Sequence, residues 1–177
     1  MQADFGTELI ALLPNLRRFA ISLCKSRDIA DDLIQITCEK ALANQGSFQP
    51  GTRLDAWLFR IMRNAWIDRI RKHKTEGVVV DIDDSPVLIG TDGGAVTENR
   101  LMLNATAKAI EGLPDDQRAV LVLVTVEELS YKEASEALGV PIGTVMSRLA
   151  RARKALHAEL GINSNPSRLP DGKGNEP

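Results

Sequence analysis

The chain has 177 residues, is 44% hydrophobic and 26% charged, and carries a formal net charge of −2 at pH 7, a composition typical of a globular protein with one or two small domains. No run approaches the roughly eighteen consecutive apolar residues of a transmembrane helix, and the N-terminus lacks a basic region followed by an apolar stretch, so we expect no membrane insertion and a cytoplasmic location. The spacing of Cys24, Cys38, His73 and His157 predicts no metal site and two buried or half-buried free thiols.

Helical periodicity dominates the first 75 residues, and no strand-length alternation is visible, which predicts an all-α protein. A first helix is predicted over 7–24 with a break or late start at Pro14, and its buried stripe is Leu13, Leu16, Phe19, Ala20 and Leu23. A second helix is predicted over 29–44, and a Gly- and Pro-rich turn over 46–52. A third helix is predicted over 53–74, with an inward stripe of Trp57, Leu58, Ile61 and Ala65.

The periodicity is lost over 75–97 and returns after it. This middle stretch predicts a flexible acidic linker, in which "GVVVDI" is extended or disordered because no partner strand is visible. Helices are predicted again over 98–111, with Gly112 as a stop, and from "LPDDQ" onward, where a proline stands in the first turn. The last residues, 162–177, have too little apolar content to fold and predict a disordered tail.

The charges are sorted along the chain. Residues 51–75 carry seven Arg and Lys against two Asp, residues 76–98 carry six acidic groups and no Arg or Lys, and residues 141–157 carry four Arg and Lys and no acidic group. Two cationic blocks separated by an acidic stretch indicate two contact surfaces on one polyanion, joined by a linker. The alternative is two solvated helix faces.

The stretch "SYKEASEALGVPIGTVMSRLARARKAL", residues 130–156, predicts a helix-turn-helix. Ala134 allows close helix approach, Gly139 allows the turn, and Val145 and Leu149 face inward. Thr144, Ser147, Arg148 and Arg151 then point away, as they would on a helix that reads the major groove, and Arg153 and Lys154 lie nearer phosphates. An ordinary αα-hairpin with a basic solvated face is the alternative.

Three motifs in this order resemble a known family, the extracytoplasmic-function group (group 4) of bacterial sigma-70 RNA polymerase sigma factors. "DDLIQIT" is similar to the family's core-binding motif, "AWLFRIMRNAWIDRIRK" to its promoter-melting and −10 segment, and the stretch from "LPDDQ" to "RARKAL" to its −35-binding region. The resemblance covers roughly residues 8–74 and 98–160.

The resemblance implies two small helical domains. A sigma2-like domain over 7–75 would bind core polymerase and recognise and melt the −10 element, a linker would cover 76–97, and a sigma4-like helix-turn-helix domain over 98–161 would bind the −35 element, followed by the tail 162–177. The implied partners are core RNA polymerase (its β′ clamp and β flap), promoter DNA and an anti-sigma factor. The implied function is transcription initiation in a stress response, with no enzymatic activity and no cofactor.

The resemblance also assigns residues. Core-polymerase binding falls on Asp31, Asp32, Leu33, Gln35 and Thr37. Binding to −10 DNA falls on Arg60, Arg63, Asn64, Trp66, Arg69, Arg71 and Lys72. Asn64 would sit at a helix break and capture a flipped base, while Trp66 is either a wall of that pocket or a core residue. Binding to −35 DNA falls on Thr144, Ser147, Arg148, Arg151, Arg153 and Lys154. Met146 and Ile36 depart from the family pattern, which usually has a basic residue and a glutamate there.

Two other classes of protein remain as alternatives. A stand-alone helix-turn-helix regulator would bind operator DNA as a dimer without polymerase, but it leaves residues 26–74 unexplained. An enzyme would need a nucleophile–base set, a phosphate loop or metal spacing, and the sequence shows none of these. Dependence of promoter binding on core polymerase separates a sigma factor from a stand-alone regulator.

Overall fold

The described part of the chain is built from helices. The structure is a computed structural model, and it describes residues 4–77 and 98–161. The N-terminal half, 4–77, contains α1 (Phe5–Ala11), α2 (Leu13–Cys24), α3 (Arg27–Ala43), a 3₁₀ turn η1 (Gln45–Ser47) and α4 (Leu54–Glu76). The C-terminal half, 98–161, contains α5 (Glu98–Glu111), α6 (Asp115–Leu121), a π-helical turn η2 (Val122–Val126), α7 (Tyr131–Leu138) and α8 (Ile142–Glu159). Neither half contains a strand, so the predicted all-α class is confirmed.

Three predictions fall on residues that the structure leaves undescribed. They concern the acidic linker, the extended or disordered "VVVDI" segment within it, and the tail 162–177. Only the first two residues of the predicted linker are described. Glu76 is the last residue of α4, and Gly77 follows the helix in the left-handed conformation, with φ of 66°.

Helix boundaries follow short-range signals in the sequence. Pro14 stands in the first turn of α2, where its missing N–H loses no hydrogen bond, and it separates α2 from α1 as predicted. Ser26 caps α3, because its hydroxyl accepts a hydrogen bond from the backbone N–H of Ile29 at 3.5 Å. A capping box opens α7: the N–H of Glu133 donates to Ser130 Oγ at 3.2 Å, and the N–H of Ser130 donates to the Glu133 carboxylate at 2.8 Å.

The predicted break in the third helix is wrong. Helix α4 runs unbroken for 23 residues, and Asn64 lies inside it on the exposed side. Between Leu54 and Glu76 the sequence has no glycine or proline that would interrupt the backbone hydrogen bonds. A continuous helix also keeps Leu58 and Ala65 on one buried face.

Helices α2, α3 and α4 enclose the core of the N-terminal half. The rings of Phe19 and Phe59 meet edge to face, with centroids 5.0 Å apart. On α2 the predicted stripe is confirmed except at Leu13, the first residue of the helix, which is 36% exposed. The side chains with no exposed surface in this core include Leu16, Phe19, Leu33, Leu58, Phe59 and Met62. Phe59 and Met62 were not among the residues predicted for the inward stripe of α4.

The C-terminal half contains the predicted helix-turn-helix. Ala134 is fully buried on α7, Gly139 ends α7 with φ of 61°, and α8 begins three residues later. Val145 and Leu149 are buried on α8, as expected for its inward face, and α8 packs on both α6 and α7. The prediction that Val145 and Leu149 face inward is therefore confirmed.

A Gly139→Ala variant is expected to lose about 1–2 kcal/mol of unfolding free energy, because a residue with a Cβ is strained at positive φ. The added Cβ would also lie 3.2 Å from Nη1 of Arg63, which would have to shift. Chemical denaturation followed by far-UV circular dichroism measures the loss. Gly143→Ala in α8 is the matched control, since its Cβ would meet no atom within 4 Å and should leave stability unchanged or higher. Equal stability of the two variants would contradict the prediction.

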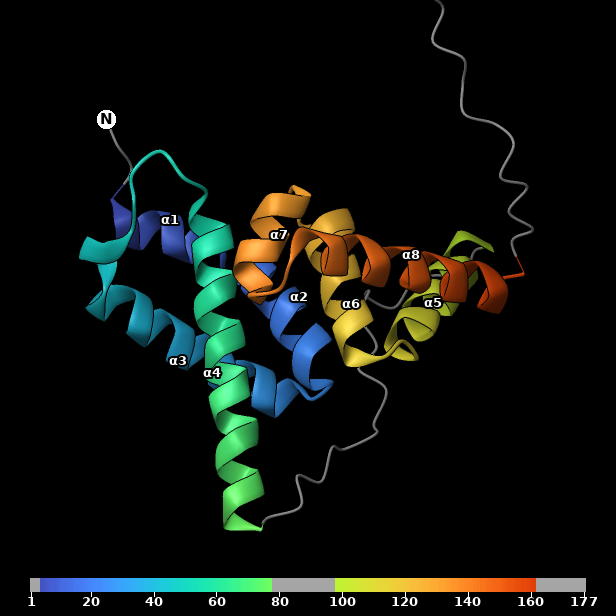
Figure 1. Cartoon of the computed structure of the whole chain (residues 1–177), viewed down its shortest axis with the longest axis horizontal. Helices are drawn as coiled ribbons and strands as arrows, with labels where there is room; N and C mark the ends of the chain where they lie inside the picture. The colour runs from blue at the N-terminus through green and yellow to red at the C-terminus, as the bar shows by residue number, and fades with distance from the viewer. Residues whose placement is uncertain (1–3, 78–97, 162–177) are drawn as a thin grey trace, which may run out of the picture.

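The two halves pack against each other. Helix α7 lies beside α4, and α6 with η2 lies beside α2 (Figure 1). Their buried residues form one continuous hydrophobic cluster. Arg118 of α6 is 2% exposed and donates to the backbone carbonyl of Ser22 on α2 at 2.6 Å. The division of the chain into two domains separated by a linker over 76–97 stays a prediction. The structure shows that the two halves share a packed interface.

Candidate nucleic-acid and polymerase interface

One face of α3 carries exposed acidic and amide side chains. Of the five residues predicted to bind polymerase, Asp31, Asp32 and Gln35 are exposed there. Leu33 and Thr37 are fully buried, and the Thr37 hydroxyl donates to the Leu33 carbonyl at 2.6 Å. In this arrangement the two buried residues anchor α3 on the core, and their side chains do not reach the surface.

Both exposed aspartates have arginine partners. Asp31 pairs with Arg17 at 2.8 Å, and the two side chains are 56% and 60% exposed. Asp32 pairs with Arg69 of α4 at 3.5 Å, and its side chain is 61% exposed. Ion pairs this open to water contribute little and are screened by salt. A protein partner can therefore compete for these carboxylates.

Basic side chains surround the second half of α4, whose C-terminal end projects beyond the other helices (Figure 1). The predicted −10 residues divide by burial. The exposed ones are Arg60, Asn64, Arg71 and Lys72, and the half-buried ones are Arg63, Trp66 and Arg69. Trp66 packs against the edge of the hydrophobic cluster, which favours the core interpretation of this residue in the present arrangement.

Helix α8 presents the predicted −35 residues. Ser147, Arg151, Arg153 and Lys154 are exposed, and Thr144 and Arg148 are half-buried. The Ser147 hydroxyl donates to the Thr144 carbonyl at 3.1 Å. Arg148 Nε lies 3.1 Å from a carboxylate oxygen of Asp116 on α6. The structure thus groups these residues on the accessible part of one helix.

Arg63 of the predicted −10 surface lies against the helix-turn-helix. The Arg63 guanidinium lies against the turn at Gly139. Its Nη1 would be 3.2 Å from a Cβ added to this glycine. Burial, together with the positive charge of Arg148, lowers the pKa of Arg63. The sequence pattern assigns Arg63 and Arg148 to different DNA elements, and nothing in it indicates that their charges influence each other.

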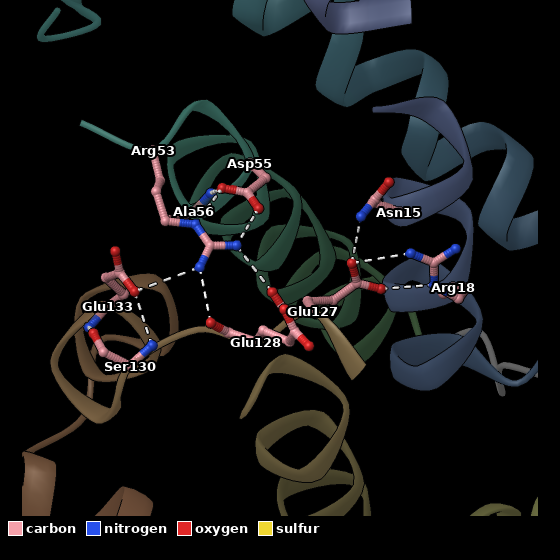
Figure 2. A network of polar contacts seen from close by, with 9 residues as sticks. All are labelled: Asn15, Arg18, Arg53, Asp55, Ala56, Glu127, Glu128, Ser130 and Glu133. Carbon is pink, nitrogen blue, oxygen red and sulfur yellow. Dashed lines mark hydrogen bonds and ion pairs between the residues drawn. The ribbon is translucent and has the colours of Figure 1, made fainter. Parts of the chain in front are cut away.

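A polar network that the sequence does not predict joins the halves (Figure 2). The carboxylate of Glu127, in the loop after η2, is fully buried and accepts hydrogen bonds from Asn15 and Arg18 on α2. Arg53, which precedes α4, donates to the backbone carbonyls of Glu127 and Glu128 at 2.9 and 2.8 Å. The only sequence signal is "VTVEEL", two acids after an apolar run, and it does not identify partners.

A groove of about 590 Å³ runs along this junction between α2, α3, α5 and α6. Its lining is mostly apolar and includes Ile21, Ile110 and Val122, and Arg17 and Arg18 are among its charged lining residues. Its volume lies within the range of pockets that bind ligands in proteins.

Other types of site find no support within residues 4–77 and 98–161. No group of three or more His, Cys, Asp or Glu side chains is placed to hold a metal ion there. None of the described helices combines the length and apolarity needed to cross a bilayer. Cys24 is buried and Cys38 half-buried, both are free thiols, and burial raises the pKa of each.

Comparison with known families identifies two matching regions. The family model described as Sigma-70 region 2 matches residues 9–76, and the model described as Sigma-70, region 4 matches residues 103–156. These regions correspond to the N-terminal half and to most of the C-terminal half.

Similar proteins and structures extend the match over most of the chain. The ECF RNA polymerase sigma factor EcfG of Rhodopseudomonas palustris (strain TIE-1) is 40% identical over 164 residues, covering 93% of this chain and 89% of that protein. SigM of Bacillus subtilis (strain 168), also an ECF RNA polymerase sigma factor, is 34% identical over 82% of this chain and 90% of its own length. The sigma factor RpoE of Bartonella quintana, solved with the anti-sigma factor NepR, aligns with a TM-score of 0.72 and 38% identity over 91% of this chain and 99% of that one. CnrH, solved with the cytosolic domain of CnrY, aligns with a TM-score of 0.61 and 27% identity over 90% of this chain and 89% of that one.

Proposed function

The chain belongs to the extracytoplasmic-function sigma factors of the sigma-70 family, and we propose that it docks on the clamp of the polymerase β′ subunit through α3. As an alternative sigma factor it binds core RNA polymerase and directs promoter recognition and transcription initiation. The support for α3 is the exposed set of Asp31, Asp32 and Gln35, two of which are held only by solvent-accessible ion pairs. The C-terminal half supplies the second contact, to the β flap, and the chain acts in the cytoplasm with its polymerase.

The proposed −10 surface is the basic side of α4. Arg71 and Lys72 are exposed near its projecting end and neutralise phosphates, which lowers the cost of holding opened DNA. Asn64 is exposed, and its amide can both donate to and accept from the edge of an extruded base. Because α4 is unbroken here, a pocket around Asn64 forms only when DNA arrives.

The proposed −35 surface is the outer face of α8. Thr144, Ser147, Arg148 and Arg151 are spaced three or four residues apart and so share one side of the helix, which enters the major groove. Arg153 and Lys154 contact phosphates. The observation that carries the whole proposal is that each family region presents its own cationic helix, α4 in one and α8 in the other.

Two tethered contacts make the binding bivalent. Neither surface needs high affinity alone, because binding of one raises the effective concentration of the other at its element. Docking on polymerase orients both surfaces along the same promoter.

We also propose control by an anti-sigma protein, within a stress response. The structural relative RpoE was solved with the anti-sigma factor NepR, and CnrH with the cytosolic domain of CnrY. The mostly apolar groove between α2, α3, α5 and α6 is a surface on which an apolar helix of such a protein could lie.

The test combines purified chain, bacterial core polymerase and a promoter duplex with both elements. Promoter binding and strand opening are expected only when core polymerase is present. Tight, specific binding of the free chain to duplex DNA as a dimer, with no association with core polymerase, would instead support the stand-alone regulator.

An Asn64→Ala variant is expected to form open complexes about tenfold less well, because one base contact of about 1–3 kcal/mol is removed from the −10 surface. Fluorescence of a 2-aminopurine placed in the −10 element measures the opening. Thr75→Ala, an exposed substitution on the same helix, is the matched control and should open the promoter normally. Normal opening by Asn64→Ala would remove Asn64 from the site.

A further inference from the structure

Two exposed apolar side chains lie near the start of α8. Ile142 is 44% exposed and Met146 is 52% exposed, and they are the exposed large apolar side chains of this helix. The core contacts of α8 are made by other residues, among them the buried Val145 and Leu149. Residues four apart lie on the same side of a helix, so Ile142 and Met146 form one patch. We call these two residues the α8 apolar pair.

Met146 is the long side chain on this strip of the helix. Gly143, three residues before it, has no side chain, and Ala150, four residues after it, has only a methyl group, and both positions are exposed. A Cβ added at Gly143 would meet nothing within 4 Å, so packing inside the protein does not require glycine there. Small residues on either side let the backbone approach a partner closely, with Met146 projecting toward it.

The surroundings of the α8 apolar pair fit a nucleic acid. Residues 141–157 carry four Arg and Lys and no acidic residue, and Arg151 and Arg153 are exposed further along the same helix. In the major groove of DNA, phosphates line both edges and base edges form the floor, so cationic and apolar side chains find partners side by side. The pair also occupies the N-terminal part of the second helix of the helix-turn-helix, which is the part that contacts base edges.

The chemistry of methionine restricts the base that this position can read. The thioether has no hydrogen-bond donor, so Met146 cannot make the two hydrogen bonds by which arginine reads guanine. The resemblance described above places a basic residue at this position, so the base contact made by this chain must differ in kind. Among the groups that bases present in the major groove, the apolar one is the C5-methyl of thymine. Its contact with Met146 removes apolar surface of both partners from water.

We propose that Met146, supported by Ile142, reads the methyl group of a thymine in the −35 element. The inference rests on the proposed function of α8 and names what one position of that surface recognises. It gives the chain a preference for thymine where a basic side chain would select guanine. The contact changes the binding constant about three- to fivefold, the effect of one methyl group removed from water.

The experiment compares thymine with uracil, which lacks only this methyl group. Holoenzyme made from the full chain and core polymerase first selects its −35 sequence from promoter duplexes randomised over that element. The selected duplex is then remade with uracil in place of thymine at one position at a time, on either strand, and affinity is measured by competition. One replacement is expected to weaken binding about three- to fivefold, and the others should change it by less than about twofold.

Three variants show whether Met146 makes the contact. Met146→Ala should bind the thymine duplex about three- to fivefold more weakly and no longer distinguish it from the uracil duplex. Met146→Arg should prefer guanine over thymine at the same position by about tenfold. Met102→Ala is the matched control, because Met102 is 62% exposed on α5, outside the helix-turn-helix, and this variant should keep the preference for thymine over uracil. Far-UV circular dichroism verifies the folding of each variant.

Four outcomes would contradict the proposal. A selected −35 sequence without thymine, or one insensitive to uracil at every position, would overturn the methyl contact. A thymine preference that survives in Met146→Ala would assign the contact to another residue, and if that variant also lost affinity for core polymerase, the α8 apolar pair would be a protein-binding surface instead. A chain that selects no −35 sequence even with core polymerase would contradict the proposed function, and this inference with it.

Discussion

An Arg118→Ala variant is expected to lose about 3–5 kcal/mol of unfolding free energy, a large share of the stability of a protein this size. Arg118 is 2% exposed and donates to the carbonyl of Ser22 at 2.6 Å and that of Leu113 at 2.8 Å, and it pairs with Asp115 at 2.8 Å. Truncation leaves two buried carbonyls without a charged donor and creates a cavity of arginine size. Urea denaturation at neutral pH measures the loss.

Arg118→Met separates the two causes. Methionine fills most of the volume and makes no hydrogen bonds, so this variant should recover the cavity contribution but not that of the hydrogen bonds, and its stability should lie between those of Arg118→Ala and the unsubstituted chain. An Arg118→Ala protein as stable as the unsubstituted chain would show that Arg118 is not structural.

An Arg148→Ala variant, measured as holoenzyme, is expected to bind its promoter with about 1–3 kcal/mol less free energy, which is roughly 5- to 150-fold, and to lose preference at one −35 position. The reason is that Arg148 lies in line with Thr144 and Arg151, on the side of α8 that we propose enters the major groove. Competition binding against a panel of −35 base substitutions measures the preference.

Arg153→Ala provides the contrast on the same helix. Arg153 is exposed and is proposed to contact phosphate, so its loss should weaken binding equally for all −35 sequences and reduce the salt dependence by about one unit. If both variants changed affinity without changing base preference, the assignment of Arg148 to base reading would be wrong.

Local features of the sequence were sufficient to predict the helices and the turn between α7 and α8. Pro14 and Gly139 act within one helical turn of their own positions, so their effects can be recognised without a structure. The inward positions Val145 and Leu149 follow from helical period alone. The break near Asn64 came from the resemblance, and the sequence there offers no helix breaker, so the structure keeps α4 continuous.

The sequence by itself therefore determined the all-α class, the helix-turn-helix, the order of the family motifs and the two cationic blocks. Only the tertiary structure decided that Leu33 and Thr37 are buried, that Glu127 pairs with Arg18, that Arg118 reaches Ser22 and that Arg63 lies beside the turn at Gly139. The physical reason is distance along the chain. Periodicity and caps act over a few residues, whereas Arg118 and Ser22 are 96 residues apart and Glu127 and Arg18 are 109 apart, so their contact depends on how whole helices pack.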